Sequence, residues 1–90
     1  MSPRVLKDGE LVFWFHSYDV AHETRASVHV GKGLQNDTLD AKIWLEPDVE
    51  IARSGRTLSV SDLRQALRTA KEHRVQLVEA WHVHRGRVQR

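Results

Sequence analysis

Hydrophobic and polar residues alternate with a period of two in the first half of the chain, which is the pattern of strands with one buried face. Runs of this kind cover residues 11–16, 27–31 and 41–45, and a shorter run covers 49–53. They are rich in β-branched or aromatic residues, and glycine, proline or polar residues follow them. The pattern predicts three or four strands, with polar loop or turn over residues 17–24 and 34–40.

The hydrophobic period changes near Ser59. Ser59 followed by Asp62 has the form of a capping box with Asp in place of Glu. The apolar residues that follow recur at helical spacing: Leu63, Ala66/Leu67, Ala70, Leu77/Val78 and Trp81. Gly86 is a natural helix stop. The pattern therefore predicts one long amphipathic helix over about residues 60–85.

A helix with one apolar stripe covers one face of a sheet. Side chains alternate across a strand, so one set of strand residues can share the face under the helix: Phe13, Phe15, Val28, Val30, Ile43 and Leu45. We expect Leu63, Leu67, Leu77 and Trp81 to be buried against this face. The predicted fold is α+β, a small antiparallel sheet of three to four strands with one long C-terminal helix packed on one face. At 90 residues the chain is a single domain, 1–86, with a basic tail at 87–90.

The opposite face of the predicted sheet carries more aromatic and ionisable side chains than solubility requires: Trp14, His16, Ser27, His29, Lys42, Trp44 and Glu46. An open aromatic face on a small sheet usually marks a partner or ligand surface. Three interpretations stay open for it. It is a surface for a cognate protein, with Trp14, Lys42 and Trp44 as contact residues, or a homodimer surface, or a second hydrophobic layer covered by the segment 17–26.

Two histidines are candidates for chemistry on this face. His16 and His29 share it if the first two strands pair in antiparallel fashion. With a carboxylate such as Glu46 or Asp19, they would suit an acid–base pair for RNA cleavage, or a zinc site. The catalytic candidates are therefore His29, His16 and Glu46. If the protein is an enzyme, we expect a metal-independent ribonuclease; surface or packing roles for these histidines are the alternative.

The sequence favours the absence of metal and of other cofactors. It contains no cysteine, and its histidine spacing matches no zinc signature. His82 and His84 are two residues apart on the predicted helix and cannot chelate one ion together. No phosphate-binding loop, dinucleotide-binding or nucleophile-elbow motif occurs.

The pI near 9.4 suggests a nucleic-acid partner, but the charge is unevenly distributed. Residues 1–58 carry a net charge of −2 and residues 59–90 a net charge of +4. Candidate phosphate contacts lie on the outer side of the predicted helix and near the chain end: Arg64, Arg68, Lys71, Arg85 and Arg87. A nucleic-acid-binding regulator is thus an alternative function. The other interpretation of these basic residues is a solvated helix surface and a solubilising tail.

Nothing in the sequence suggests a membrane partner. No apolar stretch approaches the ~18 residues of a membrane span, and the polar N-terminus does not have the form of a signal peptide. The lack of cysteine fits a reducing compartment. We therefore expect a cytoplasmic protein.

Four short motifs follow one another in a fixed order: Ser27-Val28-His29-Val30, Ala41-Lys42-Ile43-Trp44-Leu45-Glu46-Pro47, Ser59 with Asp62-Leu63, and Glu79-Ala80-Trp81-His82. In this order they resemble domain-of-unknown-function family 4160, a family of small bacterial proteins, over roughly residues 3–86. Two departures matter. Arg25-Ala26 stand where the family has Pro-Pro, and Ser27 stands where it has its first strand histidine. The resemblance therefore implies a histidine pair of which only His29 is retained.

The resemblance implies a role through genomic setting, since it brings no catalytic residue. Genes of this kind look like members of two-gene modules, often beside a gene of domain-of-unknown-function family 2442, with the character of toxin–antitoxin pairs. Our leading hypothesis is a component of such a module that binds a cognate protein through the open sheet face. RNA is the expected target if the chain is the toxin. A structural homodimer subunit without chemistry is a third hypothesis.

Overall fold

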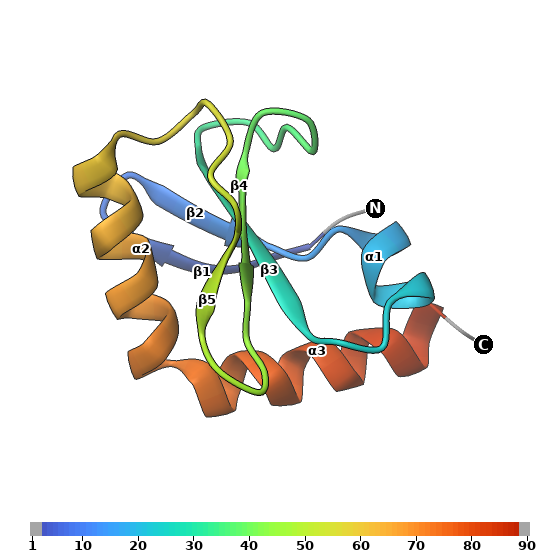
Figure 1. The fold of residues 1–90 in the computed structure, drawn as a ribbon. Coiled ribbons are helices and arrows are strands. Elements are labelled where there is room, and N and C mark those ends of the chain that lie inside the picture. The colour runs from blue at the N-terminus through green and yellow to red at the C-terminus, as the bar shows by residue number, and fades with distance from the viewer. Residues whose placement is uncertain (1–2, 89–90) are drawn as a thin grey trace.

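The computed structural model describes residues 3–88 and contains five strands and three helices within them. In chain order these are β1 Arg4–Asp8, β2 Leu11–Trp14, α1 Ser17–His22, β3 Ser27–Lys32, β4 Ala41–Trp44, β5 Glu50–Arg53, α2 Val60–Glu72 and α3 Arg74–Val88. The strands form one antiparallel sheet in the order β1-β2-β3-β4-β5, and α2 and α3 flank it (Figure 1). The α+β class is confirmed, but the strand and helix numbers differ from the prediction.

Strand β1 is absent from the prediction because its sequence, RVLKD, has no clear alternation of apolar and polar residues. Its position is decided by partners elsewhere. Gly9, with φ of 60°, makes the turn that returns the chain along β2. The carboxylate of Asp8 accepts hydrogen bonds from Thr69 Oγ1 at 2.5 Å and Gln65 Nε2 at 3.2 Å. These bonds fasten the end of the strand to α2.

Helix α1 replaces part of the loop predicted over residues 17–24. A helix of six residues is marginal on its own, so its sequence carries only a weak signal. Its docking is what stabilises it: Val20 is buried in the core, and Asp19 contacts the sheet. The segment is therefore a short helix that packs mainly against α3, while its Asp19 reaches side chains of the strands.

The prediction of one helix over residues 60–85 is wrong, since the chain forms α2 and α3 with a break at His73. The predicted start is confirmed. Ser59 Oγ accepts from the Asp62 backbone N–H, and the Asp62 carboxylate accepts from the Ser59 N–H, each at 3.1 Å. In Figure 1 the two helices run in different directions along the sheet.

Arg74 holds the chain in place at the break between α2 and α3. Its Nε donates to the carbonyl of Leu45 at 2.8 Å, and its Nη2 donates to that of Pro47 at 3.1 Å. These bonds fix the start of α3 against the β4–β5 connection. Leu77, Val78 and Trp81 follow the apolar stripe of α2 at helical spacing, so the sequence pattern predicted one helix although α3 is far less amphipathic than α2.

Gly86 does not end α3, which continues to Val88. Glycine stops a helix by adopting positive φ, and Gly86 does not do so. The predicted tail at 87–90 thus begins inside α3, and residues 89–90 lie outside the described part of the chain.

The core lies between the sheet and the two C-terminal helices. All six strand residues predicted for this face are buried, as are Leu77 and Trp81 on α3. Leu63 and Leu67 are only partly buried and pack against the edge of the core, while Ala66 and Ala70 of α2 lie inside it. The close approach of α2 through small residues explains why its leucines sit at the margin.

The other face of the sheet is largely covered, which makes the expectation of an open face wrong around Trp14 and His29. Each of these residues is only 2% exposed. Asp40, 1% exposed, lies over Gly31 of β3, and its carboxylate accepts hydrogen bonds from Trp14 Nε1 at 3.0 Å and Thr57 Oγ1 at 2.8 Å. A covered layer therefore describes this part of the face, but the contact at Trp14 comes from Asp40, which lies outside the predicted covering segment 17–26.

None of the helices within residues 3–88 combines the length and apolar character that crossing a membrane requires.

We predict that Gly31→Ala destabilises the fold, because a Cβ at this position would overlap the carboxylate of Asp40. Overpacking of this kind costs about 1–3 kcal/mol. The matched control is Gly86→Ala, where a Cβ meets nothing and the backbone is helical, so stability should rise by about 0.5–1 kcal/mol. Urea unfolding measures both. If Gly31→Ala leaves the free energy of unfolding unchanged, Asp40 can move aside without loss of stability, and the prediction is wrong.

Candidate functional site

The strand register places four polar or aromatic side chains in one row across the covered face. Trp14 of β2 lies opposite His29 of β3, His29 opposite Lys42 of β4, and Lys42 opposite Arg53 of β5. Directly paired residues project to the same side of a sheet. Because α1 lies against this row, side chains from the helix meet side chains from the strands.

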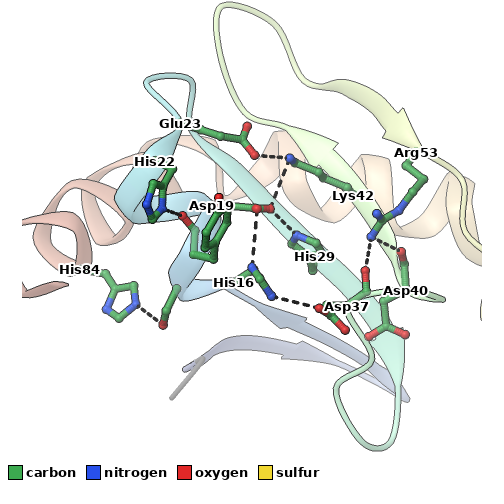
Figure 2. A network of polar contacts seen from close by, with 12 residues as sticks. His16, Asp19, His22, Glu23, His29, Asp37, Asp40, Lys42, Arg53 and His84 are labelled. Atoms are coloured by element: carbon green, nitrogen blue, oxygen red, sulfur yellow. Dashed lines mark hydrogen bonds and ion pairs between the residues drawn. The ribbon is translucent and has the colours of Figure 1, made fainter. Parts of the chain in front are cut away.

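Asp19 of α1 is the centre of the resulting cluster (Figure 2). Its Oδ2 lies 2.9 Å from His29 Nε2 and 3.3 Å from Lys42 Nζ. Its Oδ1 lies 3.5 Å from His16 Nδ1, and Lys42 also pairs with Glu23 at 2.5 Å. One carboxylate thus joins α1 to two neighbouring strands and to the residue that precedes the helix.

The cluster holds His29 in its neutral form at neutral pH. Burial lowers the pKa of His29 below its ordinary value of 6.5, by more than the hydrogen bond and charge of Asp19 raise it. The carboxylate can only accept, so His29 Nε2 carries the proton and donates it. His29 Nδ1 is buried with no hydrogen-bond partner among the described residues, so a second proton there would have no acceptor.

Asp19 is held ionised by the same contacts. Desolvation raises the pKa of Asp19, but the hydrogen bond from His29 and the charge of Lys42 outweigh it, and the pKa lies below 3.8. Ionised Asp19 beside neutral His29 and cationic Lys42 gives a stable charge arrangement. The contacts of Asp19 with His29 and with Lys42 therefore both favour the ionised carboxylate.

The three catalytic candidates are only partly brought together. His16 and His29 lie on either side of Asp19, with ring centroids 5.5 Å apart. The His29 side chain is 3% exposed and that of His16 is 24% exposed, so only His16 can meet a molecule from solution. His16 Nε2 faces Asp37 Oδ2 at 3.3 Å.

Glu46 has a different position. Its Oε2 accepts a hydrogen bond from the backbone N–H of Ala26 at 3.0 Å, and its carbonyl accepts from Arg25 Nε. It therefore stabilises the approach to β3, and Asp19 is the carboxylate beside the histidines. The sequence signal for the position of Asp19 is that an acidic residue is favoured in the first turn of a helix. The signal could not be used, because α1 itself was not predicted.

The three residues predicted to contact a partner also differ from one another in position. Trp14 is buried and Lys42 is mostly buried within the cluster. Trp44 is half-buried, with the Arg25 guanidinium 4.3 Å and the Lys42 ammonium 4.6 Å from its ring centroid. Of the three, Trp44 is the residue nearest to a surface role.

The basic candidates do not form one surface. Arg64, Arg68 and Lys71 are exposed on α2. Arg85 is half-buried, 5.3 Å from the ring centroid of Trp81, and Arg87 is exposed near the end of α3. Figure 1 places α2 and the C-terminal end of α3 at opposite ends of the molecule.

Within residues 3–88, no group of three or more His, Asp or Glu side chains is arranged to hold a metal ion. The cluster around Asp19 is therefore described by hydrogen bonds and ion pairs alone.

Comparison with known proteins assigns the chain to a family. The family described as "Domain of unknown function (DUF4160)" matches residues 11–82. No curated protein and no solved structure matches significantly. Because the family match covers most of the 90 residues, the chain belongs to this family.

We predict that stability falls as the pH drops below about 6.5, the ordinary pKa of histidine. The unfolded chain protonates His29 there while the folded chain does not, so protons favour unfolding in the window between 6.5 and the lower folded pKa. A further loss follows below pH 3.8, where unfolded Asp19 gains a proton that the folded state resists.

Urea midpoints across about pH 2.5–8 measure both effects, and the comparison with His29→Gln, which removes the titrating imidazole, isolates the loss below pH 6.5. The matched control is His82→Gln, an exposed histidine whose loss should leave the profile unchanged. A His29→Gln profile parallel to that of the unmodified protein would contradict the prediction.

Proposed function

We propose that this member of the DUF4160 family is a cytoplasmic component of a two-gene toxin–antitoxin-like module, and that it binds its cognate protein through a surface beside α1. This surface, called the α1 surface below, consists of Tyr18, His22, Glu23, Arg25, Lys42 and Trp44. The observations that carry the proposal are the exposed ring of Tyr18, stacked on His22, and the half-buried ring of Trp44, contacted by Arg25 and Lys42.

Printed contacts link the members of the α1 surface in two groups. Tyr18 is 64% exposed, and its ring stacks on His22 with centroids 4.0 Å apart. Lys42 bridges Glu23 and Trp44, and Arg25 contacts Trp44 from the chain segment before β3. His22 is the last residue of α1 and Glu23 is its C-cap residue, so each group has a member at this end of the helix.

The residue types favour protein binding. Tyrosine, tryptophan and arginine are enriched among the residues that contribute most to interface affinity. The stacking and ion pairs already restrict these side chains, so ordering them on binding costs less conformational entropy. Buried His29, which is bonded to Asp19 of α1 and lies opposite Lys42 in the sheet, provides a fixed support for this surface. The proposed binding surface is thus α1 and its neighbours, and not the sheet face itself.

The occupant that we propose is the product of the neighbouring gene, as the family resemblance implies. A second copy of the chain is the other occupant that the test must separate. The two are distinguished because a homodimer forms from the purified chain alone.

We predict that Tyr18→Ala and Trp44→Ala each weaken binding of the cognate protein by about 2 kcal/mol, close to 30-fold in Kd. Co-purification identifies the complex and calorimetry measures its affinity. The matched control is Val75→Ala, since Val75 is 66% exposed but lies at the start of α3. Unfolding of each variant is measured in parallel because Trp44 also packs on the sheet.

Unchanged affinity in both variants would contradict the α1 surface as the binding site. If light scattering instead finds a dimer of the chain that Tyr18→Ala dissociates, the surface joins two copies, and the cognate-protein assignment is wrong.

A further inference from the structure

A second surface lies on the same side of the sheet as α1, over β1 and β2. The register places Arg4 opposite Trp14 and Lys7 opposite Val12. Trp14 projects away from α2 and α3, so Arg4 and Lys7 project to that side as well. Both cationic side chains belong to exposed residues of an edge strand.

A shallow groove passes beside these two cations. One hollow is lined by Arg4, Lys7, Gly9, Glu10, Val12, Lys32 and Gly33. An adjoining hollow shares Arg4, Val12 and Gly33 with it and continues along Leu34 and Gln35. Together they form one groove, called the β1 groove below, with buried Val12 at its base and Leu34, which is 93% exposed, at its rim.

The charge of the β1 groove is not neutralised within the protein. Lys32 pairs with Asp62 at 3.0 Å and with Glu10 at 3.6 Å, so the one carboxylate of the groove already faces a cation. Among residues 3–88, Arg4 and Lys7 make no ion pair. Two unpaired cations beside a shallow groove that is open to solvent attract anionic groups.

We propose that the β1 groove binds single-stranded nucleic acid, with Arg4 and Lys7 on successive phosphates and a base against Leu34. Guanidinium and ammonium groups are the usual partners of phosphate oxygens. The groove is open to solvent, which lets a chain pass along it. The exposed apolar side chain of Leu34 offers contact to an unpaired base, which a duplex keeps inside its stack.

This site differs from the basic positions considered from the sequence. Arg64, Arg68 and Lys71 lie on α2, which packs on the opposite side of the sheet from the β1 groove. The proposal also shares no residue with the α1 surface, so it is independent of the proposed function. Its failure would leave binding of the cognate protein untouched.

The test is fluorescence anisotropy of a labelled single-stranded RNA of about 12 nucleotides, with a DNA of the same sequence in parallel. Titrations between about 50 and 200 mM salt give the slope of log K against log salt concentration. Each phosphate contact contributes about −0.7 to this slope for single strands, so we expect about −1.4 for the unmodified chain.

Arg4→Gln and Lys7→Gln should each weaken binding at low salt and reduce the slope by about 0.7 in magnitude. Leu34→Ala should weaken binding and leave the slope unchanged, because it removes an apolar contact. None of these exposed side chains supports the core, so thermal unfolding of all three variants should match the unmodified protein.

The matched control is the double variant Arg64→Gln/Arg68→Gln, which should bind as the unmodified chain does. Loss of binding in this variant with retention in Arg4→Gln and Lys7→Gln would overturn the proposal in favour of α2. Absence of measurable binding by the unmodified chain would also overturn it. Displacement of the RNA by an acidic polyglutamate peptide at equal charge concentration would show a general anion surface and reject the nucleic-acid assignment.

Discussion

The buried carboxylate of Asp40 is the interaction on which one side of this protein depends. It is 1% exposed and lies over Gly31, where only a glycine leaves room for it. It accepts hydrogen bonds from the indole of Trp14, the hydroxyl of Thr57 and the backbone N–H of Asn36. A buried carboxylate is costly unless its oxygens are bonded, so these three donors must stay in place together. Strand β2, the segment after β3 and the segment before α2 are thereby held to one another.

Asp19 holds α1 in place in the same way, through a carboxylate that is bonded to the sheet. It attaches α1 to the sheet through His29 and Lys42. Burial raises the pKa of Asp19, but the contacts with His29 and Lys42 lower it below its ordinary value, so the carboxylate stays an ionised acceptor. The aromatic and ionisable residues of this face therefore become internal contacts. The features that remain for binding lie outside the cover, at α1 on one side and along β1 on the other.

The motif around His29 and the motif around Trp44 supply a buried imidazole and a half-buried indole to the same face. The histidine supports the position of Asp19, and the tryptophan supports the α1 surface. We propose binding as the function of this face, because the His29 side chain is enclosed and the more exposed residues nearby include Tyr18, Trp44 and Arg25.

The sequence by itself determined the features that depend on local pattern. The alternation in 11–16, 27–31 and 41–45 gave three central strands, and the Ser59–Asp62 box marked the start of α2. The core face followed from the same period, since Phe13, Val28 and Ile43 can be buried on one side only. The family could also be recognised, because short motifs in a fixed order survive as sequence.

Only the tertiary structure decided the features that depend on partners distant in the chain. Strand β1 forms because Asp8 bonds to Thr69 and Gln65, and α3 turns away from α2 where Arg74 bonds to Leu45 and Pro47. Helix α1 is too short to show a period, so its place over His29 could not be read from residues 17–24. The site was therefore predicted in its histidines, whereas Asp19 was only one of two possible carboxylates and Glu46 was the one chosen as the catalytic candidate. A strand pattern shows which face a residue occupies, whereas the segment that covers that face is chosen by contacts formed only in the folded chain.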